Sequence, residues 1–193
     1  IGANPFVMNT TITDNSADLE AGGIYLSDFM AVQGKVIVQN NSGGDVHIVG
    51  ISDNMATIRV AGSLEGSWIG VSGNPEVGLI CYDFQKYNSG ADPADYFFAK
   101  PGYSVVQGWK GDAEIVKSEW PQLQKKIRDT EDGGTLKLDR DWKAIDSDDQ
   151  LKVPEGKTVT IDLNGHTIDR NRGSSDKDGH VIEVFGTLTL TDS

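Results

Sequence analysis

Residues 11–72 contain six short strand-like segments, and this stretch decides the fold: TITDN (11–15), GIYLS (23–27), VIVQN (36–40), DVHIV (45–49), TIRVA (57–61) and WIGVS (68–72). Apolar and polar residues alternate within them, which is typical of half-buried strands. Taken alternately, the segments form two series with a period of roughly 22 residues. A strand–helix–strand unit needs about 30 residues or more. The shorter period fits a chain that closes one coil and stacks it on the next, about 4.8 Å away.

The spacing of apolar residues predicts which side chains stack on one another. One predicted inward ladder, with separations of 25 and 21 residues, is Ile12, Ile37 and Ile58. The solvent-facing row beside it is predicted as Thr13, Val38 and Arg59. A second series, with separations of 22 and 23 residues, is Ile24, Val46 and Ile69. An antiparallel sandwich is the alternative fold, and the constant registry argues against it.

The C-terminal part has the same period with different residues. Two separations of 23 residues join Leu136, Val159 and Ile182, and 22 residues separate Ile168 from Leu190. The predicted strands are Thr135–Leu138, Thr158–Leu163, His166–Asp169, Val181–Val184 and Thr187–Thr191. Asn164-Gly165 and Gly186 are predicted to supply turns between strands.

Residues 74–117 interrupt the period and concentrate aromatic side chains, namely Tyr96, Phe97, Phe98 and Tyr103. We expect them to cap one end of the stacked coils, because an open strand edge would template aggregation. A helix is predicted over about 121–128. Pro121 suits its first turn, Gly133-Gly134 ends it, and one face carries Trp120, Leu123 and Ile127. We expect this face to cover the coil that begins at Thr135.

Three parts of the chain match a known repeat pattern. The helix face just described is followed by GTLKL (134–138) and LKVPEGKTVTIDLNGHTI (151–168), and residues 182–192 continue the pattern. Residues 11–28 and 96–106 look like closing coils and a terminal cap of the same type. The chain therefore resembles the parallel β-helix repeats of large bacterial surface proteins with the pectate-lyase-like fold, in permuted order. The resemblance implies an all-β, right-handed parallel β-helix with one short capping helix, in a secreted or cell-surface protein.

The predicted organisation has three parts. Residues 1–73 form closing coils, residues 74–117 form a terminal cap and linker, and residues 118–193 form a capping helix and opening coils. Open coil edges would lie at both ends of this arrangement. We expect them to be completed within one chain or by a neighbouring molecule. Because the chain begins at Ile1 rather than Met, we interpret it as a processed protein or a piece of a longer one.

The net charge, the apolar stretches and the single cysteine exclude several classes of partner and site. The net charge is −12, so nucleic acid is a poor partner, because binding phosphates relies on Lys and Arg. No stretch approaches the roughly 20 apolar residues of a membrane span, and we predict none. Cys81 is the single cysteine, which excludes an internal disulfide and a Cys-based zinc site. It lies in the apolar run 77–81, which predicts a buried small hydrophobic residue.

Several short motifs imitate binding sites. Gly156-Lys157-Thr158 resembles the end of a phosphate-binding loop, but that motif requires glycine where Leu151 stands, so we predict a turn. Residues 146–149 and 176–178 are acidic clusters that offer carboxylates to Ca²⁺, although neither has EF-hand spacing and solvated turns are the simpler interpretation. No metal-ligand spacing relates the three histidines, His47, His166 and His180.

The candidates for carbohydrate chemistry are scattered. A polysaccharide lyase or glycosidase would draw on outward-facing charged residues such as Arg59, Arg170, Arg172 and Glu183. Nothing in the sequence places these four together. Sugar stacking is a hypothesis for Tyr25 and Trp68, with core or cap packing as the alternative. There is no Gly-x-Ser-x-Gly elbow, and Cys81 has no histidine near it in sequence.

The sequence therefore predicts no catalytic, cofactor-binding or metal-binding residues. Our leading hypothesis is a noncatalytic structural, adhesion or self-assembly segment of a secreted or cell-surface bacterial protein. Its expected partners are further copies, joined end to end, and a glycan or host surface. The alternative is a carbohydrate-active module, either a polysaccharide lyase or a glycan-binding domain.

Overall fold

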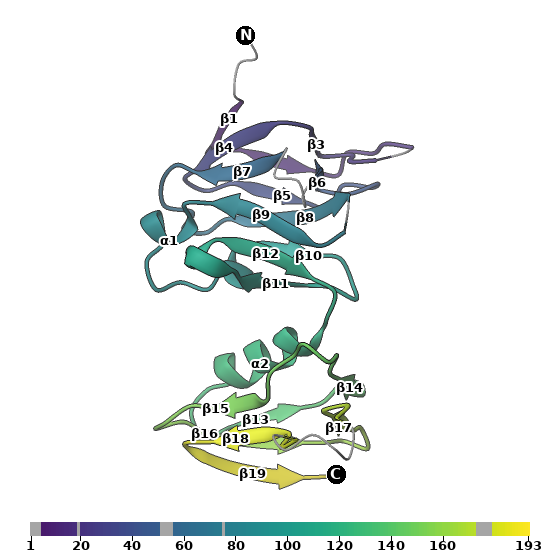
Figure 1. Ribbon diagram of the computed structural model, residues 1–193, viewed down its shortest axis with the longest axis vertical. Coiled ribbons are helices and arrows are strands. Elements are labelled where there is room, and N and C mark those ends of the chain that lie inside the picture. The colour runs from purple at the N-terminus through teal and green to yellow at the C-terminus, as the bar shows by residue number, and fades with distance from the viewer. Residues whose placement is uncertain (1–4, 19, 51–55, 75, 173–178) are drawn as a thin grey trace. The chain divides into compact units, whose positions relative to one another are not determined.

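The computed structural model describes residues 5–18, 20–50, 56–74, 76–172 and 179–193. The chain forms two compact units, Ile1–Lys117 (unit 1) and Ser118–Ser193 (unit 2) (Figure 1). Both units consist mainly of short β-strands, most of which pair in parallel. Each unit has an apolar core of its own.

Unit 1 contains three parallel ladders. The first comprises β1 (Phe6–Met8), β4 (Phe29–Gln33), β7 (Thr57–Val60) and β9 (Gly78–Tyr82). The second comprises β2 (Thr11–Thr13), β5 (Ile37–Gln39), the first half of β8 (Trp68–Asn74) and β10 (Phe97–Ala99). The third comprises β3 (Ile24–Leu26), β6 (Val46–Val49) and the second half of β8. The chain passes through the ladders in this order and then returns to the first. We call one such passage a circuit.

In the second ladder β10 still pairs in parallel with β8, whereas in the first ladder the parallel pairing ends at β9. There β12 (Ala113–Val116) pairs antiparallel with β9, and β11 (Ser104–Gln107) pairs antiparallel with β12. Three short helices accompany them: α1 (Phe84–Tyr87), η2 (Pro93–Asp95) and η3 (Trp109–Gly111). Phe84 is fully buried and meets the ring edges of Tyr96 and Phe97. Two members of the predicted aromatic cluster, Phe97 and Tyr103, are thus core residues.

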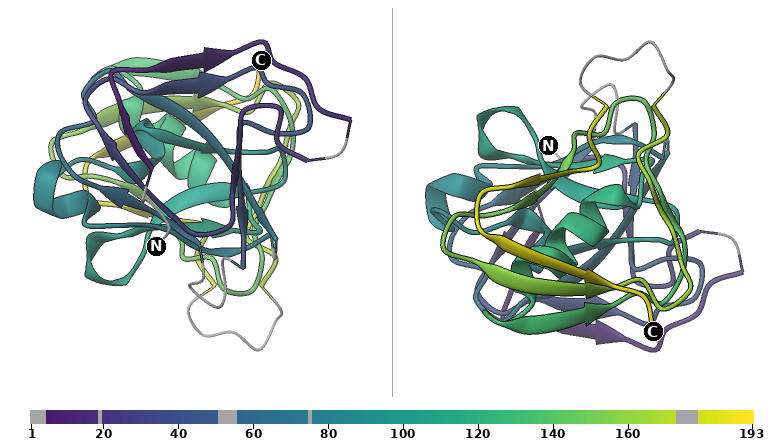
Figure 2. Two further views of the ribbon diagram at one scale, coloured as in Figure 1. Left: turned by 90° about the horizontal axis from the view of Figure 1, so that it is seen from above. Right: turned by 90° about the horizontal axis from the view of Figure 1, so that it is seen from below.

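Unit 2 has three further ladders, visited in the same cyclic order. They are β13 (Gly134–Lys137), β16 (Thr158–Asp162) and β19 (Thr187–Thr191); β14 (Trp142–Lys143) and β17 (Ile168–Asp169); and β15 (Leu151–Val153) and β18 (Ile182–Val184). All of their pairings are parallel. Figure 2 shows the strands of each unit lying on several sides of its interior. The parallel pairing excludes the antiparallel sandwich as a description of these ladders.

The predicted helix is confirmed as α2 (Trp120–Asp129). Its proline stands near the start, and the face that carries Trp120, Leu123 and Ile127 is buried in the core of unit 2. The helix contacts β14 and β15 of the first circuit of that unit. The apolar spacing therefore predicted both the helix and the side it buries.

The turn between the second and third ladders of unit 1 has the same backbone conformation in successive circuits. Asp14 and Asn40 occupy it with φ angles of 60° and 59°, a left-handed conformation that Asn and Asp tolerate better than most residues. Asn15 and Asn41 follow them and are hydrogen-bonded to each other. In unit 2, Asn164-Gly165 forms the predicted turn, with φ angles of 51° and 77°.

The positions of the predicted strands agree with the structure, but the predicted ladders of unit 1 are partly wrong. Ile12 pairs with Val38, not Ile37, and Val38 is 1% exposed instead of solvent-facing. Ile58 belongs to the first ladder, where it pairs with Met30 and Cys81. The physical reason is that a slip of one residue turns every side chain of a strand to the opposite face. The circuits differ in length, so an average period does not fix the register.

The second series and the C-terminal series need the same correction. We call a series of register partners in successive circuits a rung. Ile24 does pair with Val46, but the next residue in that rung is Val71, not Ile69. In unit 2 the actual rungs are Leu136–Ile161–Leu190, Gly134–Val159–Leu188, Trp142–Ile168 and Leu151–Ile182. The predicted set Leu136, Val159 and Ile182 is therefore divided among three rungs.

Candidate functional site

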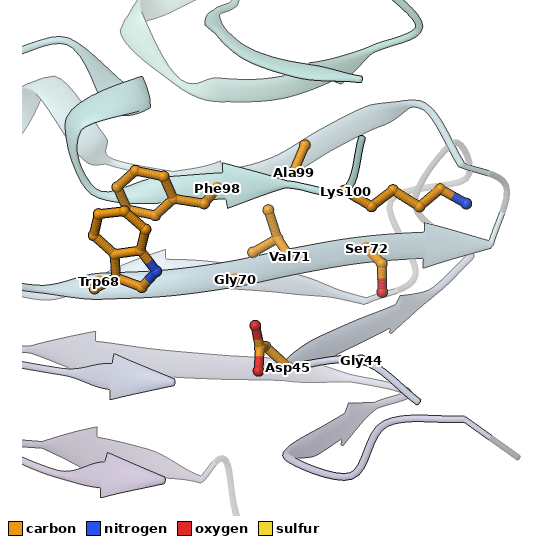
Figure 3. A pocket seen from close by; sticks show the side chains of 9 residues that line it. All are labelled: Gly44, Asp45, Trp68, Gly70, Val71, Ser72, Phe98, Ala99 and Lys100. Atoms are coloured by element: carbon orange, nitrogen blue, oxygen red, sulfur yellow. The ribbon is translucent and has the colours of Figure 1, made fainter. Parts of the chain in front are cut away.

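An open hollow of about 190 Å³ lies on the outer face of the second and third ladders of unit 1 (Figure 3). We call it the Trp68 hollow. Its lining residues are Gly44, Asp45, Trp68, Gly70, Val71, Ser72, Phe98, Ala99 and Lys100. They come from the turn before β6, from β8, and from β10 with the residue after it. Parallel pairing brings these three distant segments side by side.

Gly70 occupies an outward position of β8 and lines the hollow. Its neighbours Ile69 and Val71 point inward and are buried, as strand alternation requires. A Cβ atom at position 70 would stand 2.0 Å from Asp45 Oδ2. The missing side chain therefore lets the Asp45 carboxylate lie over the strand.

Asp45 is held by the turn that precedes β6. Its Oδ1 accepts hydrogen bonds from the backbone nitrogen and from Nδ2 of Asn41, both at 2.9 Å. Its other oxygen, Oδ2, has no hydrogen-bond partner within the described part of the chain. Figure 3 shows the carboxylate directed towards β8. The hydrogen bonds to Oδ1 therefore orient the carboxylate, and Oδ2 remains as an acceptor in the hollow.

Trp68 and Phe98 form the aromatic wall. Their ring centroids lie 3.4 Å apart with an interplanar angle of 10°, so the rings are stacked. Phe98 is the register partner of Gly70, the outward position of β8 that follows Trp68. Trp68 is 45% exposed, and Figure 3 shows its ring nitrogen on the side facing Gly70. Trp68 Nε1 has no hydrogen-bond partner among the described residues, so a donor and an acceptor face the same space.

A row of three outward side chains ends at the hollow. Tyr25, His47 and Ser72 are consecutive partners in the third ladder, and Tyr25 stacks on His47 with ring centroids 5.9 Å apart. His47 Nδ1 is 3.2 Å from Ser72 Oγ, and His47 Nε2 is 3.7 Å from Glu20 Oε2. Serine, histidine and glutamate are the residue types of a nucleophilic triad. However, 3.7 Å exceeds hydrogen-bond length, so Glu20 does not orient the imidazole. We interpret the row as fixing the Ser72 hydroxyl at the rim.

Lys100 is paired at the far side of the hollow. Its ammonium group and the Tyr103 hydroxyl both donate to the Glu76 carboxylate, and Lys100 Nζ lies 4.9 Å from the centroid of the Tyr103 ring. The hydrogen bonds from Lys100 and Tyr103 lower the pKa of Glu76, and the same carboxylate raises the pKa of Tyr103. Because Glu76 offsets the lysine charge, the carboxylate of Asp45 dominates the charge of the hollow.

The phosphate-loop look-alike serves the fold, as predicted for a turn. Gly156 has a φ of 76°, and Lys157 Nζ donates to the carbonyl oxygens of Arg128 and Thr130 at the end of α2. The last carbonyl oxygens of an α-helix lie beyond its internal hydrogen bonds, and a cation is stabilising there.

The acidic and histidine candidates occupy separate structural positions. Asp148 Oδ2 accepts from Ser118 Oγ and from the Ile145 nitrogen, both at 2.8 Å, so it stabilises a turn. The second acidic cluster, residues 176–178, lies outside the described residues. His166 Nδ1 is 3.6 Å from Asp141 Oδ1, and His180 is exposed. Within the described ranges, no group of three potential metal ligands occurs.

Cys81 is fully buried in the core of unit 1, as predicted. Burial raises the pKa of its thiol to about 12, mainly because the charged form would lose its hydration. A thiol in this state is unreactive at neutral pH.

The four charged candidates for carbohydrate chemistry do not form one site. Arg59 belongs to unit 1, is exposed, and places Nε 3.2 Å from Asp83 Oδ2. Arg170 was expected to face outward, but it is 4% exposed. The remaining two belong to unit 2, where Arg172 donates to the Asp148 carbonyl oxygen and Glu183 accepts from Gln150 Nε2 at 3.1 Å.

Comparison with family models, curated proteins and solved structures found no match for this chain. Among the described helices, none has the length and apolar composition needed to cross a membrane. The site described here therefore rests on its geometry alone.

Sequence reasoning identified Trp68 but not the rest of the hollow. Asp45, Ser72 and Phe98 had appeared only as members of strands or of an aromatic cluster. The signal that was available is Gly70, a glycine at an outward position inside a strand, which often marks a close approach to the backbone.

Proposed function

We propose that the chain is a noncatalytic structural segment of a secreted or cell-surface bacterial protein. In this proposal the ladders are parts of right-handed parallel β-helices, and the last circuit of unit 2 in one copy stacks on the first circuit of unit 1 in another. The proposal is supported by the parallel ladders of both units and by the state of their outermost strands.

The observation that carries the proposal is the exposure of inward-facing residues in the last circuit of unit 2. Ile161 is 0% exposed, whereas Leu190, the next residue in the same rung, is 56% exposed. Likewise Val153 is 0% exposed and its partner Val184 is 45% exposed. These side chains occupy core positions and lack a further circuit above them among the described residues. Covering them would remove apolar surface from water, which favours association.

The first circuit of unit 1 presents a matching surface. Val7, Ile12 and Ile24 are inward positions that are only partly buried. Their partners in the next circuit, listed in the same order, are Val32, Val38 and Val46, each at most 1% exposed. Both ends therefore offer aliphatic side chains at core positions. This similarity favours a second copy of the chain as the occupant.

The backbone of β19 also has hydrogen-bonding capacity directed away from β16. Thr187 donates to the Lys157 carbonyl oxygen, and the Thr191 carbonyl oxygen accepts from Leu163. In a parallel ladder alternate residues bond to one neighbour, so the N–H groups of Leu188 and Leu190 point the other way. An open edge of this kind is a template for another strand.

The roles of the chemically suggestive residues favour structure over catalysis. Lys157 caps α2, Asp148 holds a turn, and Cys81 is a core residue. The net charge of −12 further suits a protein surface that stays soluble and avoids nucleic acid.

Sedimentation velocity of the full chain over a range of concentrations tests the proposal. We expect reversible, concentration-dependent association, weakened by Leu190→Lys because a charge would be buried between circuits. Ile145→Lys is the matched control, because Ile145 is a 40% exposed apolar residue of the same unit outside β19. A wild-type chain that stays monomeric at all concentrations would overturn the proposal, as would an equal effect of the two substitutions.

A further inference from the structure

The Trp68 hollow is lined by an aromatic pair and by polar side chains from neighbouring segments. Trp68 Nε1 is a donor and Asp45 Oδ2 is an acceptor, and neither has a hydrogen-bond partner among the described residues. Ser72 Oγ, held by His47, adds a hydroxyl at the rim. Small-ligand sites pair an apolar or aromatic wall with a few convergent polar groups of this kind.

We propose that this hollow binds one neutral sugar ring, as a terminal or branch unit of a glycan. A pyranose carries both hydroxyl donors and hydroxyl acceptors around a ring with apolar C–H edges. Its hydroxyls match the Trp68 N–H and the Asp45 carboxylate, and its C–H groups match the Trp68–Phe98 wall. This function is independent of the end-to-end stacking proposed above, because the hollow lies on the lateral face of β8.

The size of the hollow suits a ligand of one ring. Its volume is about 190 Å³, below the roughly 300 Å³ at which sites for drug-sized molecules begin. An oligosaccharide would therefore contact the protein through a single residue. We expect a dissociation constant in the millimolar range, since a ligand of this size makes few contacts.

The charge of the hollow selects a neutral ring over an acidic one. Asp45 Oδ2 faces the hollow, and the Lys100 ammonium is already paired with Glu76. A uronate carboxylate would meet the Asp45 charge, and the described lining of the hollow contains no unpaired cation to offset it. The hollow therefore disfavours the acidic sugars on which lyase-type enzymes act.

Titration of the full chain with methyl glucoside, methyl galactoside and galacturonate, followed by ligand-observed NMR, tests the proposal. We expect one of the two neutral sugars to bind and galacturonate to bind more weakly. Trp68→Phe keeps an aromatic ring but removes the N–H, and we expect about fivefold weaker binding from the loss of one hydrogen bond. Trp109→Phe is the matched control, because Trp109 is 85% exposed and does not line the hollow.

A second substitution tests the charge argument separately. Asp45→Asn keeps an acceptor for Asn41 but removes the negative charge, so galacturonate should then bind as well as the neutral sugar. The proposal fails if neither neutral sugar binds, or if Trp68→Phe and Trp109→Phe change affinity equally. It also fails if the wild-type chain prefers galacturonate. None of these results depends on whether the chain self-associates, so the two proposals fail independently.

Discussion

Replacing Asn41 with alanine is predicted to destabilise unit 1 by about 3 kcal/mol. Asn41 is 7% exposed, and its side chain joins two circuits. Its Nδ2 donates to the carbonyl oxygens of Ile12 and Gln39, both at 3.0 Å, and to Asp45 Oδ1. Its Oδ1 accepts from the backbone nitrogen and from Nδ2 of Asn15. Alanine removes all of these bonds together.

The magnitude follows from which partners water can reach. Three lost bonds leave partly buried backbone groups behind, namely the two carbonyl oxygens and the Asn15 nitrogen. Each is worth about 1 kcal/mol when its partner is deleted without replacement. The bonds to the side chains of Asp45 and Asn15 are more easily replaced by water, and we count them as small. The sum is therefore about 3 kcal/mol.

Urea unfolding followed by circular dichroism measures this loss as a lower transition midpoint at an unchanged slope. Asn15→Ala is the control, because Asn15 is exposed and its side chain donates to Thr13 and Asn41. We expect it to cost less than about 1 kcal/mol. If the two alanine variants unfold at the same urea concentration, the stacked asparagines do not join the circuits and the reasoning is wrong.

Three further predictions concern the core and its titratable groups. Ile161→Ala should cost about 2–5 kcal/mol in urea unfolding and Leu190→Ala much less in dilute monomer, because only Ile161 is fully buried although both share one rung. Cys81 should react with a thiol reagent only as the protein unfolds, since burial raises its pKa to about 12; rapid labelling of the native chain would contradict this. The hydroxyl of Ser193 donates to Asp162 and is the main cause that lowers the pKa of Asp162. A lowered folded-state pKa contributes stability above the unfolded value of about 4 and loses it as pH falls further, so Asp162→Asn should flatten acid unfolding curves.

The strands and the main helix could be predicted because their signals are local. Alternation of apolar and polar residues located β16 and β19 within a residue of their actual ends, and the spacing of Trp120, Leu123 and Ile127 located α2. Each of these patterns is set by the geometry of one element. The turn at Asn164-Gly165 is likewise encoded by the two residues that adopt it.

Register could not be predicted because it depends on the length of each turn. The shift from Ile37 to Val38 as the partner of Ile12 is a single residue, yet it exchanges the inward and outward faces of β5. The antiparallel strands β11 and β12 were missed for a related reason. Their partner β9 is chosen by tertiary packing, and nothing within residues 104–116 specifies the direction of pairing.

The Trp68 hollow was hidden from the sequence because its residues meet only after register is set. Gly70 faces Phe98 in the second ladder, and Asp45 reaches Gly70 from the turn before β6. An error of one position in β8 would turn Trp68 and Gly70 inward and abolish the site. A site of this kind becomes visible only when the ladders are known residue by residue.

Asn41, whose side chain joins two circuits, also positions a residue of the Trp68 hollow. Asn41 uses its backbone nitrogen and Nδ2 to hold Asp45 Oδ1, and this leaves Oδ2 lying over Gly70 in the hollow. Asn41→Ala keeps the backbone nitrogen but removes the second anchor, so the carboxylate gains rotational freedom that binding must then remove. Sugar affinity should therefore fall in Asn41→Ala under conditions where unit 1 remains folded, whereas Asn15→Ala, which does not touch Asp45, should retain it. Unchanged affinity in Asn41→Ala would show that the orientation of the carboxylate does not matter, and that the hollow does not read hydroxyl groups through it.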